Sequence, residues 1–579
     1  MIFAILLINE TITLKQFLYI FFFCISISGY AQNFYLKIEG SNISESQIID
    51  SLKYNPKHFN LKSLFAEIQK TSLNLSKQGF IDNSIQETLQ NNDSTYISKI
   101  SLKNKIKEIH IYIGTNIFFL SSDKIQNDTL IIPYEKIESY LNQKIIDAEK
   151  RGFALTKIKL ENIQKKNSII TASLNFKSEK KRSLNSIIIN YVNQDSNNFF
   201  PKAHFKQLNK KYLNKTFNQE TIKELYDDIN SFEFVNQTKY PEILFTTDST
   251  KIYAYIEKRK ANTFDGYIGF SNNENKKLIL NGYLDISLIN TLRAGEQFSL
   301  YWKSDGNQQK TFNAKLEVPY IFRSSLGIKA QLNIFKQDST FQNTKTSIDL
   351  GYYINYNSKI YLGYQSTESS DIQNTNNSSI SDFKNSYTTS TYSYKKLDNE
   401  NILYPQKIFL NCIIGYGKRN TNNSLETAQP SKQFYTSLNL SYNFELNDKN
   451  FFYVNSQNYF LKSKNYITNE LFRFGGMNSI RGFSENSLQG NNVNLLMTEY
   501  RYLTSSNLYL HSILDYGIYQ DQTSFNNNKK IRNLLSFGVG LGLLTKSGLL
   551  KISIANGTTN SEEIKFYNSL LNICYNVKF

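Results

Sequence analysis

The chain has 579 residues, a formal net charge of +17, 40 Tyr and 41 Phe, and 40% hydrophobic residues. This length is too great for one ordinary domain and leaves room for several. The positive charge does not predict nucleic-acid binding, because Lys is abundant along the whole chain and no single basic helix or patch collects it. An aromatic-rich chain of modest hydropathy is instead typical of a β-barrel, in which lipid-facing and lumen-facing residues alternate along each strand.

The N-terminal segment predicts export. Residues 17–27 form a short apolar core after Lys15, followed by Ser-Gly-Tyr-Ala. We therefore predict a secretory signal peptide over residues 1–31, cleaved after Ala31. Glu10 interrupts the apolar run, so a membrane-spanning helix is the weaker interpretation. No other apolar run in the sequence approaches the length of a membrane helix, and an exported chain of this kind is either soluble or a β-barrel.

One pattern then occurs three times, in residues 32–104, 105–180 and 181–260. Each copy begins with a short alternating strand (34–40, 108–114 and 186–192), continues with an amphipathic helix and ends with two more alternating strands. Small sheets of this kind leave an edge strand that can accept an incoming chain by backbone hydrogen bonding. The predicted apolar helical faces are Leu61, Leu64, Phe65, Ile68 and Leu75; Ile137, Tyr140, Leu141, Ile145 and Ala148; and Ile222, Leu225, Tyr226, Ile229 and Phe232.

Residues 261–579 have a different sequence pattern. Helical periodicity ends there, and alternating runs are separated by turns rich in Asn, Ser, Asp and Gly. At roughly 20 residues for each strand and its connection, this region holds about 16 strands. We predict an antiparallel transmembrane β-barrel. The predicted strands include residues 277–289, 297–303, 326–335, 347–356 and 433–444, and in the last one Leu571, Ile573, Tyr575, Val577 and Phe579 share one face.

A glycine-rich stretch inside this region, residues 472–484, predicts a tightly folded loop. Gly475, Gly476 and Gly482 permit positive φ angles. Arg481 lies between Ile480 and Gly482-Phe483, so its guanidinium is expected to rest against a wall, where it needs carboxylates to satisfy it. The two candidates are Glu499 and Asp515, which follow in alternating segments. The simpler alternative is a surface hairpin with an exposed Arg.

Residues 475–483, the strand containing Glu499 and the Asp515-x-Gly517 sequence together resemble the C-terminal barrel of the BamA/TamA superfamily. These proteins are outer-membrane assembly and translocation barrels with periplasmic POTRA domains. The resemblance implies α+β POTRA repeats followed by a barrel of about 16 strands. It also implies that the loop folds back into the lumen, where Arg481 pairs with Glu499 and Asp515 on the inner wall.

Residue-level matching covers roughly residues 472–557 and the C-terminus, where Tyr575, Val577 and Phe579 resemble the recognition signal of outer-membrane barrels. Ile513 departs from the Phe or Gly that the superfamily often has two residues before the Asp. The resemblance therefore rests on one loop, two acidic strands and the final strand, together with the order of the repeats.

No arrangement for covalent catalysis is present in the sequence, so we expect neither enzyme activity nor a cofactor nor a metal site. The series Gly538-x-Gly540-x-Gly542 lacks the spacing and the following helix of a nucleotide-binding loop. We expect these glycines to leave space on the inner wall for the Arg481 loop. The four histidines are scattered without metal-ligand spacing: His58, His110, His204 and His511.

The expected function is mechanical. The resemblance implies an outer-membrane assembly or translocation factor, closer to TamA than to BamA because it has three repeats. Its periplasmic repeats would receive unfolded outer-membrane or secreted clients, and an accessory periplasmic or inner-membrane protein, on their edge strands. The barrel, surrounded by outer-membrane lipid, would open between its first strand, near residues 264–271, and its last, residues 571–579.

Three alternatives stay open. A two-partner secretion transporter exports one dedicated protein, but that group usually carries two POTRA domains and an N-terminal plug helix, and no helix fits between Ala31 and Phe34. A passive pore or surface-binding barrel explains the strands but not the repeats or the Arg481 loop. A secreted enzyme lacks any catalytic constellation.

Overall fold

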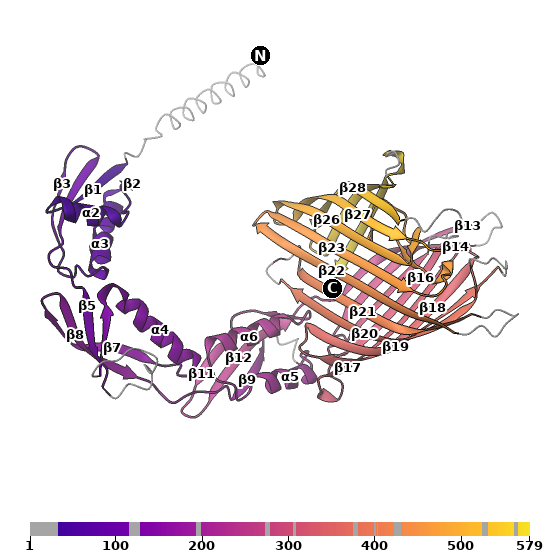
Figure 1. The fold of residues 1–579 in the computed structure, drawn as a ribbon, viewed down its shortest axis with the longest axis horizontal. Helices are drawn as coiled ribbons and strands as arrows, with labels where there is room; N and C mark the ends of the chain where they lie inside the picture. The colour runs from indigo at the N-terminus through magenta and orange to yellow at the C-terminus, as the bar shows by residue number, and fades with distance from the viewer. Residues whose placement is uncertain are drawn as a thin grey trace, which may run out of the picture. The chain divides into compact units, whose positions relative to one another are not determined.

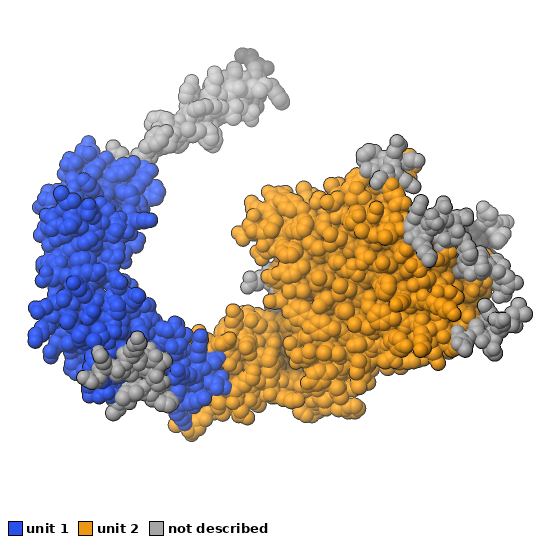
Figure 2. Space-filling model, viewed as in Figure 1, with its two compact units in different colours: residues 1–182, 216–218 blue, residues 183–215, 219–579 orange. Residues whose placement is uncertain are grey.

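The computed structural model describes residues 33–114, 128–192, 198–272, 278–304, 309–373, 380–398, 401, 403–421, 430–523, 531–560 and 566–579. The predicted signal peptide lies outside these ranges. The chain divides into two compact units, residues 1–182 with 216–218 and residues 183–215 with 219–579 (Figure 2). None of the helices within the described ranges is both long enough and apolar enough to cross a membrane.

The first module has the predicted order of a strand, helices and two strands. Its elements are β1 (Phe34–Gly40), α2 (Ile43–Ser51), β2 (Lys57–His58), α3 (Leu61–Lys77), β3 (Ser84–Gln90) and β4 (Thr95–Ser101), in a sheet of order β2-β1-β4-β3. The Asn42 and Asn60 side chains cap the two helices by accepting hydrogen bonds from backbone N–H groups of the first turn. Gly79, at a φ of +103°, follows the end of α3.

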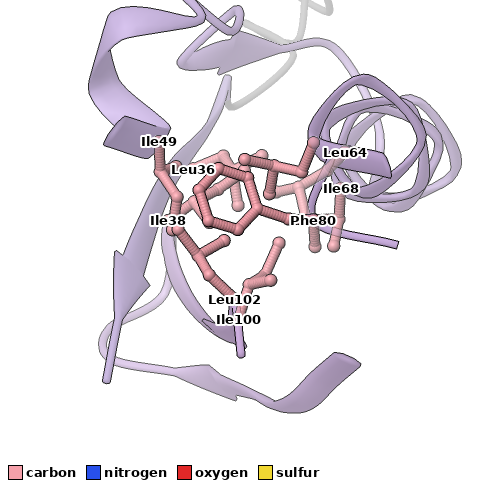
Figure 3. Packing of buried hydrophobic residues seen from close by; sticks show 9 residues of the cluster. Leu36, Ile38, Ile49, Leu64, Ile68, Phe80, Ile100 and Leu102 are labelled. Atoms are coloured by element: carbon pink, nitrogen blue, oxygen red, sulfur yellow. The ribbon is translucent and has the colours of Figure 1, made fainter. Parts of the chain in front are cut away.

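An apolar core joins the helices of this module to its sheet. Figure 3 shows the Phe80 ring among side chains from both helices and from the strands. Leu64, Ile68 and Leu75 of α3 are buried as predicted, but Phe65 is 48% exposed and Leu61 is also exposed. The predicted apolar face was therefore wrong at these two residues. The apolar stripe of α3 is broader than the part of the helix that the sheet covers.

The second module contains β5 (Glu108–Tyr112), β6 (Thr129–Pro133), the short 3-10 helix η2 (Tyr134–Lys136), α4 (Ile137–Lys150), β7 (Lys157–Lys166) and β8 (Ile169–Lys177). Its sheet has the order β6-β5-β8-β7. Of the predicted α4 face, Ala148 is fully buried, whereas Ile137 and Tyr140 are partly buried against a core formed mainly by strand residues. The helix therefore adds less to this core than its 3.6-residue periodicity predicts.

The third module contains β9 (Ser186–Tyr191), α5 (Lys202–Tyr212), α6 (Gln219–Asn230), β10 (Val235–Gln237), β11 (Glu242–Phe245) and β12 (Thr250–Lys258). Strand β12 pairs in parallel with β9 and antiparallel with β10 and β11. Ile222, Leu225 and Ile229 of α6 are buried, as the sequence predicts, and Phe232 is buried just beyond the helix.

Of the remaining strands, all but β24 and β25 form a closed antiparallel barrel of 16 strands, which confirms the predicted fold class (Figure 1). Neighbours in the chain are neighbours in the barrel, and the last strand returns to the first. The barrel strands are β13 (Thr263–Asn272), β14 (Leu278–Ile289), β15 (Gln297–Ser304), β16 (Gln309–Val318), β17 (Leu326–Gln337), β18 (Phe341–Tyr353), β19 (Ser358–Asp371), β20 (Phe383–Leu397), β21 (Gln406–Thr421), β22 (Ser431–Asn447), β23 (Asn450–Lys462), β26 (Asn492–Ser505), β27 (Leu508–Gln520), β28 (Ile531–Leu544), β29 (Gly548–Thr559) and β30 (Leu570–Lys578).

The two faces of the barrel wall differ as alternation requires. In β18, Ile348 and Leu350 are exposed on the outside, whereas Asp349 between them is 3% exposed and faces inward. In β30, Leu571 and Ile573 are likewise exposed. A barrel with an apolar outer face and a polar interior has the pattern of a transmembrane barrel.

One predicted strand was wrong at its end. Strand β18 stops at Tyr353, whereas the alternating run in the sequence continues to residue 356. Tyr356 lies in the turn after the strand and is 8% exposed. Its ring packs against His204 and Phe232 of the third module, so this position belongs to the contact with that module and not to the strand.

Candidate functional site

The segment between β23 and β26 lies inside the barrel, and we call residues 467–490 the lumen loop. The turns at residues 290–296 and 319–325 contact the third module, so β23 ends at the opposite end of the barrel and the lumen loop enters from there. It contains a small hairpin of β24 (Phe472–Phe474) and β25 (Leu488–Gly490). Its glycines have the predicted positive φ, +107° at Gly475, +98° at Gly476 and +77° at Gly482.

Arg481 binds both carboxylates that the sequence singles out. Its backbone N–H and its Nε donate to Asp515 Oδ2 at 3.1 and 2.9 Å, and its Nη2 donates to Asp515 Oδ1 at 2.6 Å. Its Nη1 forms an ion pair with Glu499. Arg481 is 6% exposed and Asp515 is fully buried. A buried bidentate pair of this kind fixes both the position and the orientation of the loop tip.

A second cation, which the sequence analysis missed, shares Glu499. Arg501 donates from Nε to Glu499 Oε2 at 2.7 Å and from Nη1 to Asn443 Oδ1 at 2.9 Å. Its guanidinium lies 4.5 Å from the ring centroid of Tyr404 and 4.4 Å from that of Tyr453. The sequence could have predicted the contact between Arg501 and Glu499, because residues two apart on β26 point to the same face of the strand.

Gly482 and Phe483 fit the loop against β29. A Cβ at Gly482 would lie 2.5 Å from backbone atoms of Asn556 and Gly557, and a Cβ at Gly557 would lie 2.5 Å from the Phe483 ring. Ile480 is fully buried in the apolar cluster beside this contact. Glycine is thus required on both sides of the junction, because any side chain would separate the loop from the wall.

The predicted role of the β28 glycines was wrong. A Cβ at Gly540 would first meet the His511 ring, and one at Gly542 would first meet the Tyr509 ring. A Cβ at Gly538 would meet backbone atoms of β29. These glycines make room for side chains and backbone of the neighbouring strands β27 and β29, whereas the lumen loop packs at Gly557.

Further polar contacts tie the lumen loop to the rest of the wall. Arg419 of β21 donates to Glu470 at 2.5 Å, and Asn469 donates to Ser369 of β19 at 2.7 Å. On the far side, Glu485 accepts a hydrogen bond from Tyr301 and forms an ion pair with Lys303, both of β15. The loop therefore crosses the lumen from β26 and β27 to β15. Sequence analysis missed these anchors because single polar residues in a loop have no periodicity.

The seam between the first and last barrel strands is the shortest strand pairing among the described residues of the barrel. Strands β13 and β30 pair at Thr263 with Lys578 and at Phe264 with Val577. Each other neighbouring pair of barrel strands is joined over at least eight residue pairs, including β29 with β30. One backbone bond, from Phe579 N to Asn262 O at 3.0 Å, extends the seam.

The C-terminal residues flank this seam. Tyr575 and Phe579 are exposed on the outer face, and Val577 between them is half-buried and pairs with Phe264. On the inner side, the Cys574 thiol donates to Asp265 Oδ2 at 2.7 Å. A few contacts thus join the two edges in place of a continuous hydrogen-bonded ladder.

The third module is held on the barrel rim by an aromatic contact centred on His204 of α5. The His204 ring lies 5.2 Å from the Phe232 ring and 4.8 Å from the Tyr320 ring of the barrel turn, measured between centroids. Neither ring nitrogen has a hydrogen-bond partner among the described residues. Burial, assisted by the nearby Lys359 charge, lowers the pKa of His204 to about 3. His204 is therefore neutral in the docked state.

Polar bonds surround this aromatic contact. Asn290 donates to the Phe199 carbonyl at 3.0 Å, and Gln207 donates to the Arg323 carbonyl at 2.9 Å. Lys395 of β20 binds Glu233 at 2.7 Å. The last module and the barrel therefore form one packed body, joined at several turns of the same rim.

Comparison with known proteins identifies the fold. The sequence matches no protein-family model and no curated protein. Among solved structures, CdiB from Acinetobacter baumannii is 14% identical, with a TM-score of 0.50 over 92% of this chain and 98% of that one. CdiB from Escherichia coli (12% identical, TM-score 0.49, covering 88% of this chain and 98% of that one) also matches. So does BamA from Haemophilus ducreyi lacking POTRA domains 1–3 (15% identical, TM-score 0.43, covering 76% and 92%). At this identity the likeness to CdiB from Acinetobacter baumannii shows a shared fold over nearly the whole of both chains.

Proposed function

We propose that this chain is an outer-membrane assembly or translocation factor of the BamA/TamA type, which receives unfolded client proteins on its modules and inserts or exports them through the barrel. The observation that carries the proposal is the contrast within one closed barrel between a two-pair seam and a lumen loop anchored at many points. Every unpaired backbone group in lipid costs several kcal/mol, roughly, so a barrel opens most easily where the fewest bonds are lost.

The outer face supports placement in an outer membrane. The exposed residues of β18 and β30 are apolar and alternate with buried polar ones, and Tyr575 and Phe579 add exposed aromatic rings near the end of the last strand. An apolar surface of this kind is unfavourable in water and favourable in contact with lipid. In this orientation the third module, which contacts the rim at His204, lies in the periplasm, and the proposal assigns the first two modules to the same compartment.

The sheet edges of the modules support capture of unfolded chains. Strand β3 is an edge of the first sheet and β7 is an edge of the second, so each has one row of backbone donors and acceptors outside the sheet. A chain added there is bound through its backbone, which gives affinity without reading sequence. Lys157, Lys159, Lys165 and Lys166 of β7 keep such an edge from pairing with a second copy of itself.

The seam supports a lateral route for clients. Opening it separates two residue pairs and exposes the edges of β13 and β30, each of which can pair with a strand of a client barrel. The Arg481 network holds β26 and β27 in register during this opening, and the Gly482 contact holds β29, the neighbour of the last strand. A client strand that pairs with both edges closes the opened seam again and leaves no unpaired backbone there in the lipid.

A transporter for one dedicated exported protein is the second candidate. The match to Acinetobacter baumannii CdiB spans nearly the whole of both chains and favours it. The presence of three modules favours general assembly, because dedicated transporters usually carry two. A passive pore fits less well, since the lumen loop crosses the interior and binds strands on both sides.

Depletion of the protein in its native host tests the proposal. Quantitative proteomics of the outer membrane would follow, with the barrel re-expressed as wild type or as Arg481→Glu. General assembly predicts that many barrel proteins fall together. Dedicated export predicts the loss of one secreted protein from the medium while other barrels stay constant. Unchanged outer-membrane and secreted proteomes would contradict both and favour a passive barrel.

A further inference from the structure

The barrel interior contains a cavity that the proposed function does not use. It has a volume of about 200 Å³ and lies between the lumen loop and strands β23, β26, β27 and β29. Because one water molecule takes up about 30 Å³ of liquid, the cavity has room for a small ion with part of its hydration shell. Its charged lining consists of three cations, Arg481, Arg501 and Lys551, and the single carboxylate of Glu499.

The charges of this cavity do not balance. Arg481 and Arg501 share Glu499, and Arg481 also binds Asp515, so two guanidinium groups use both carboxylates. Lys551 forms no ion pair and no hydrogen bond within the described ranges. One positive charge therefore faces the cavity without a counter-charge, beside two further cations, and such a site attracts an anion.

A buried histidine without hydrogen-bond partners in the described part of the chain lines the same space. His511 of β27 lines the cavity and is 8% exposed, and its Nδ1 is buried with no hydrogen-bond partner in the described part of the chain. The ring is held in place by its seat over Gly540, where a Cβ would lie 2.4 Å from Cε1. Nε2 of the same ring also lacks a hydrogen-bond partner in the described part of the chain but is not closed off, so it is the ring nitrogen that a ligand in the cavity can meet. Most polar groups at such positions in proteins have a hydrogen-bond partner, and an ion in the cavity would supply one.

We propose that this cavity is a binding site for a phosphate-type oxyanion. Lys551 supplies charge-assisted donors, and the His511 ring supplies an N–H from a fixed position. Ser553 lies two residues after Lys551 on β29 and lines the same cavity, so its hydroxyl is a third donor. Arg501, clamped between two tyrosine rings, adds attraction without having to move. The oxyanion is either a free phosphate or the phosphate of a lipid headgroup.

Calorimetric titration of the full chain in a zwitterionic detergent tests the site at constant ionic strength in chloride buffer. The two probes are inorganic phosphate and a soluble dihexanoyl phosphatidate. We expect saturable binding at one site, weakened about tenfold or more by Lys551→Met because a charge-assisted hydrogen bond is lost. Lys551→Arg should bind within about threefold of wild type. Lys546→Met, an exposed lysine in the turn before β29, is the matched control and should bind as wild type.

The two probes separate the sources of the ligand. Equal affinity for both probes means that the free phosphate ion is sufficient for binding. Binding of the phosphatidate alone means that the site recognises a lipid headgroup. If neither probe gives saturable binding, or if Lys551→Met binds as tightly as wild type, the proposal is wrong. Should Lys551→Met lose the heat-modifiable migration of a folded barrel, His511→Phe serves in its place, with the same weakening expected. None of these outcomes depends on client assembly.

Discussion

The wall that holds Arg481 and the seam between β13 and β30 belong to the same closed barrel but are built differently. Strands β26 and β27 pair over most of their length, and the lumen loop adds a buried ion-pair network on their inner face. The seam has two residue pairs, and the C-terminal Phe579 beside it is exposed on the outer face. The difference teaches that a closed barrel can be joined unequally around its circumference: β26 to β29 are fixed by pairing and by the lumen loop, whereas the edges of β13 and β30, next along the barrel, are weakly joined.

Reversing the charge of Arg481 is expected to have the largest effect on this comparison. Arg481→Glu places a third carboxylate beside Glu499 and Asp515, and loss of a buried pair costs about 3–5 kcal/mol. The barrel should lose its heat-modifiable migration at a lower temperature, and client barrels should decline in the membrane. Arg481→Lys keeps the charge but not the two-pronged geometry, so its loss should be smaller.

Rescue separates a specific pair from general damage. Asp515→Arg combined with Arg481→Glu restores opposite charges across the contact, and we expect the double variant to recover melting temperature and client levels in part. If Arg481→Glu alone melts as wild type and changes no client, the contact has no structural role. The loop would then be an ordinary hairpin.

Gly482→Ala should act on the same wall more weakly. Its φ of +77° and the 2.5 Å approach of the β29 backbone leave no room for a methyl group. Positive-φ strain and displacement of the loop predict a loss of about 1–3 kcal/mol. Ser484→Ala in the same loop is the control and should leave the melting curve unchanged. Equal melting of Gly482→Ala and wild type would mean that the loop does not rest on Gly557.

Acid should loosen the rim contact by a smaller amount. His204 has a pKa of about 3 when docked and an ordinary value near 6.5 when undocked, so its contribution is complete above pH 6.5 and falls as the pH drops toward 3. At pH 5.5 the expected loss is about 1.4 kcal/mol. Hydrogen exchange of the α5 amides, corrected for the intrinsic pH dependence of exchange, should accelerate relative to pH 7.5.

His204→Phe is the matched variant for this measurement. It keeps an aromatic ring among Phe232 and Tyr320 and removes the titrating group. Protection of α5 in this variant should therefore not change between pH 7.5 and 5.5. The same acid-induced loss in wild type and variant would place the pH sensitivity elsewhere on the rim.

The sequence predicts those parts of the molecule that repeat or that need glycine. Two-residue alternation predicts the barrel strands. Gly475 and Gly482 predict the tight loop around Arg481, and both have positive φ angles in the structure. Sequence analysis does not find contacts between single polar residues far apart in the chain. The contact of Glu485 with Lys303 joins residues 182 positions apart, and no local pattern marks either one.

The errors have the same physical origin. Phe65 and Tyr356 fit local apolar patterns, but the neighbouring surface that decides their burial comes from another part of the fold. The β28 glycines do make space as expected, but the space is taken by His511 and Tyr509 of the adjacent strand. Local sequence thus predicts that a position is small or apolar, whereas tertiary packing decides what it contacts.

Locking the seam tests the central claim most directly. Thr263→Cys with Lys578→Cys joins the paired residues of β13 and β30, in a chain whose Cys412 and Cys574 are replaced by Ser. Cα atoms of directly opposite residues lie about 4.5–5.5 Å apart, which a disulfide can bridge. Gln331→Cys with Ser347→Cys places the same bond between β17 and β18 and is the control. The account predicts that the oxidised seam pair blocks client insertion, that reductant restores it, and that the control pair has no effect. Undiminished client insertion with a fully oxidised seam would contradict the lateral-opening mechanism.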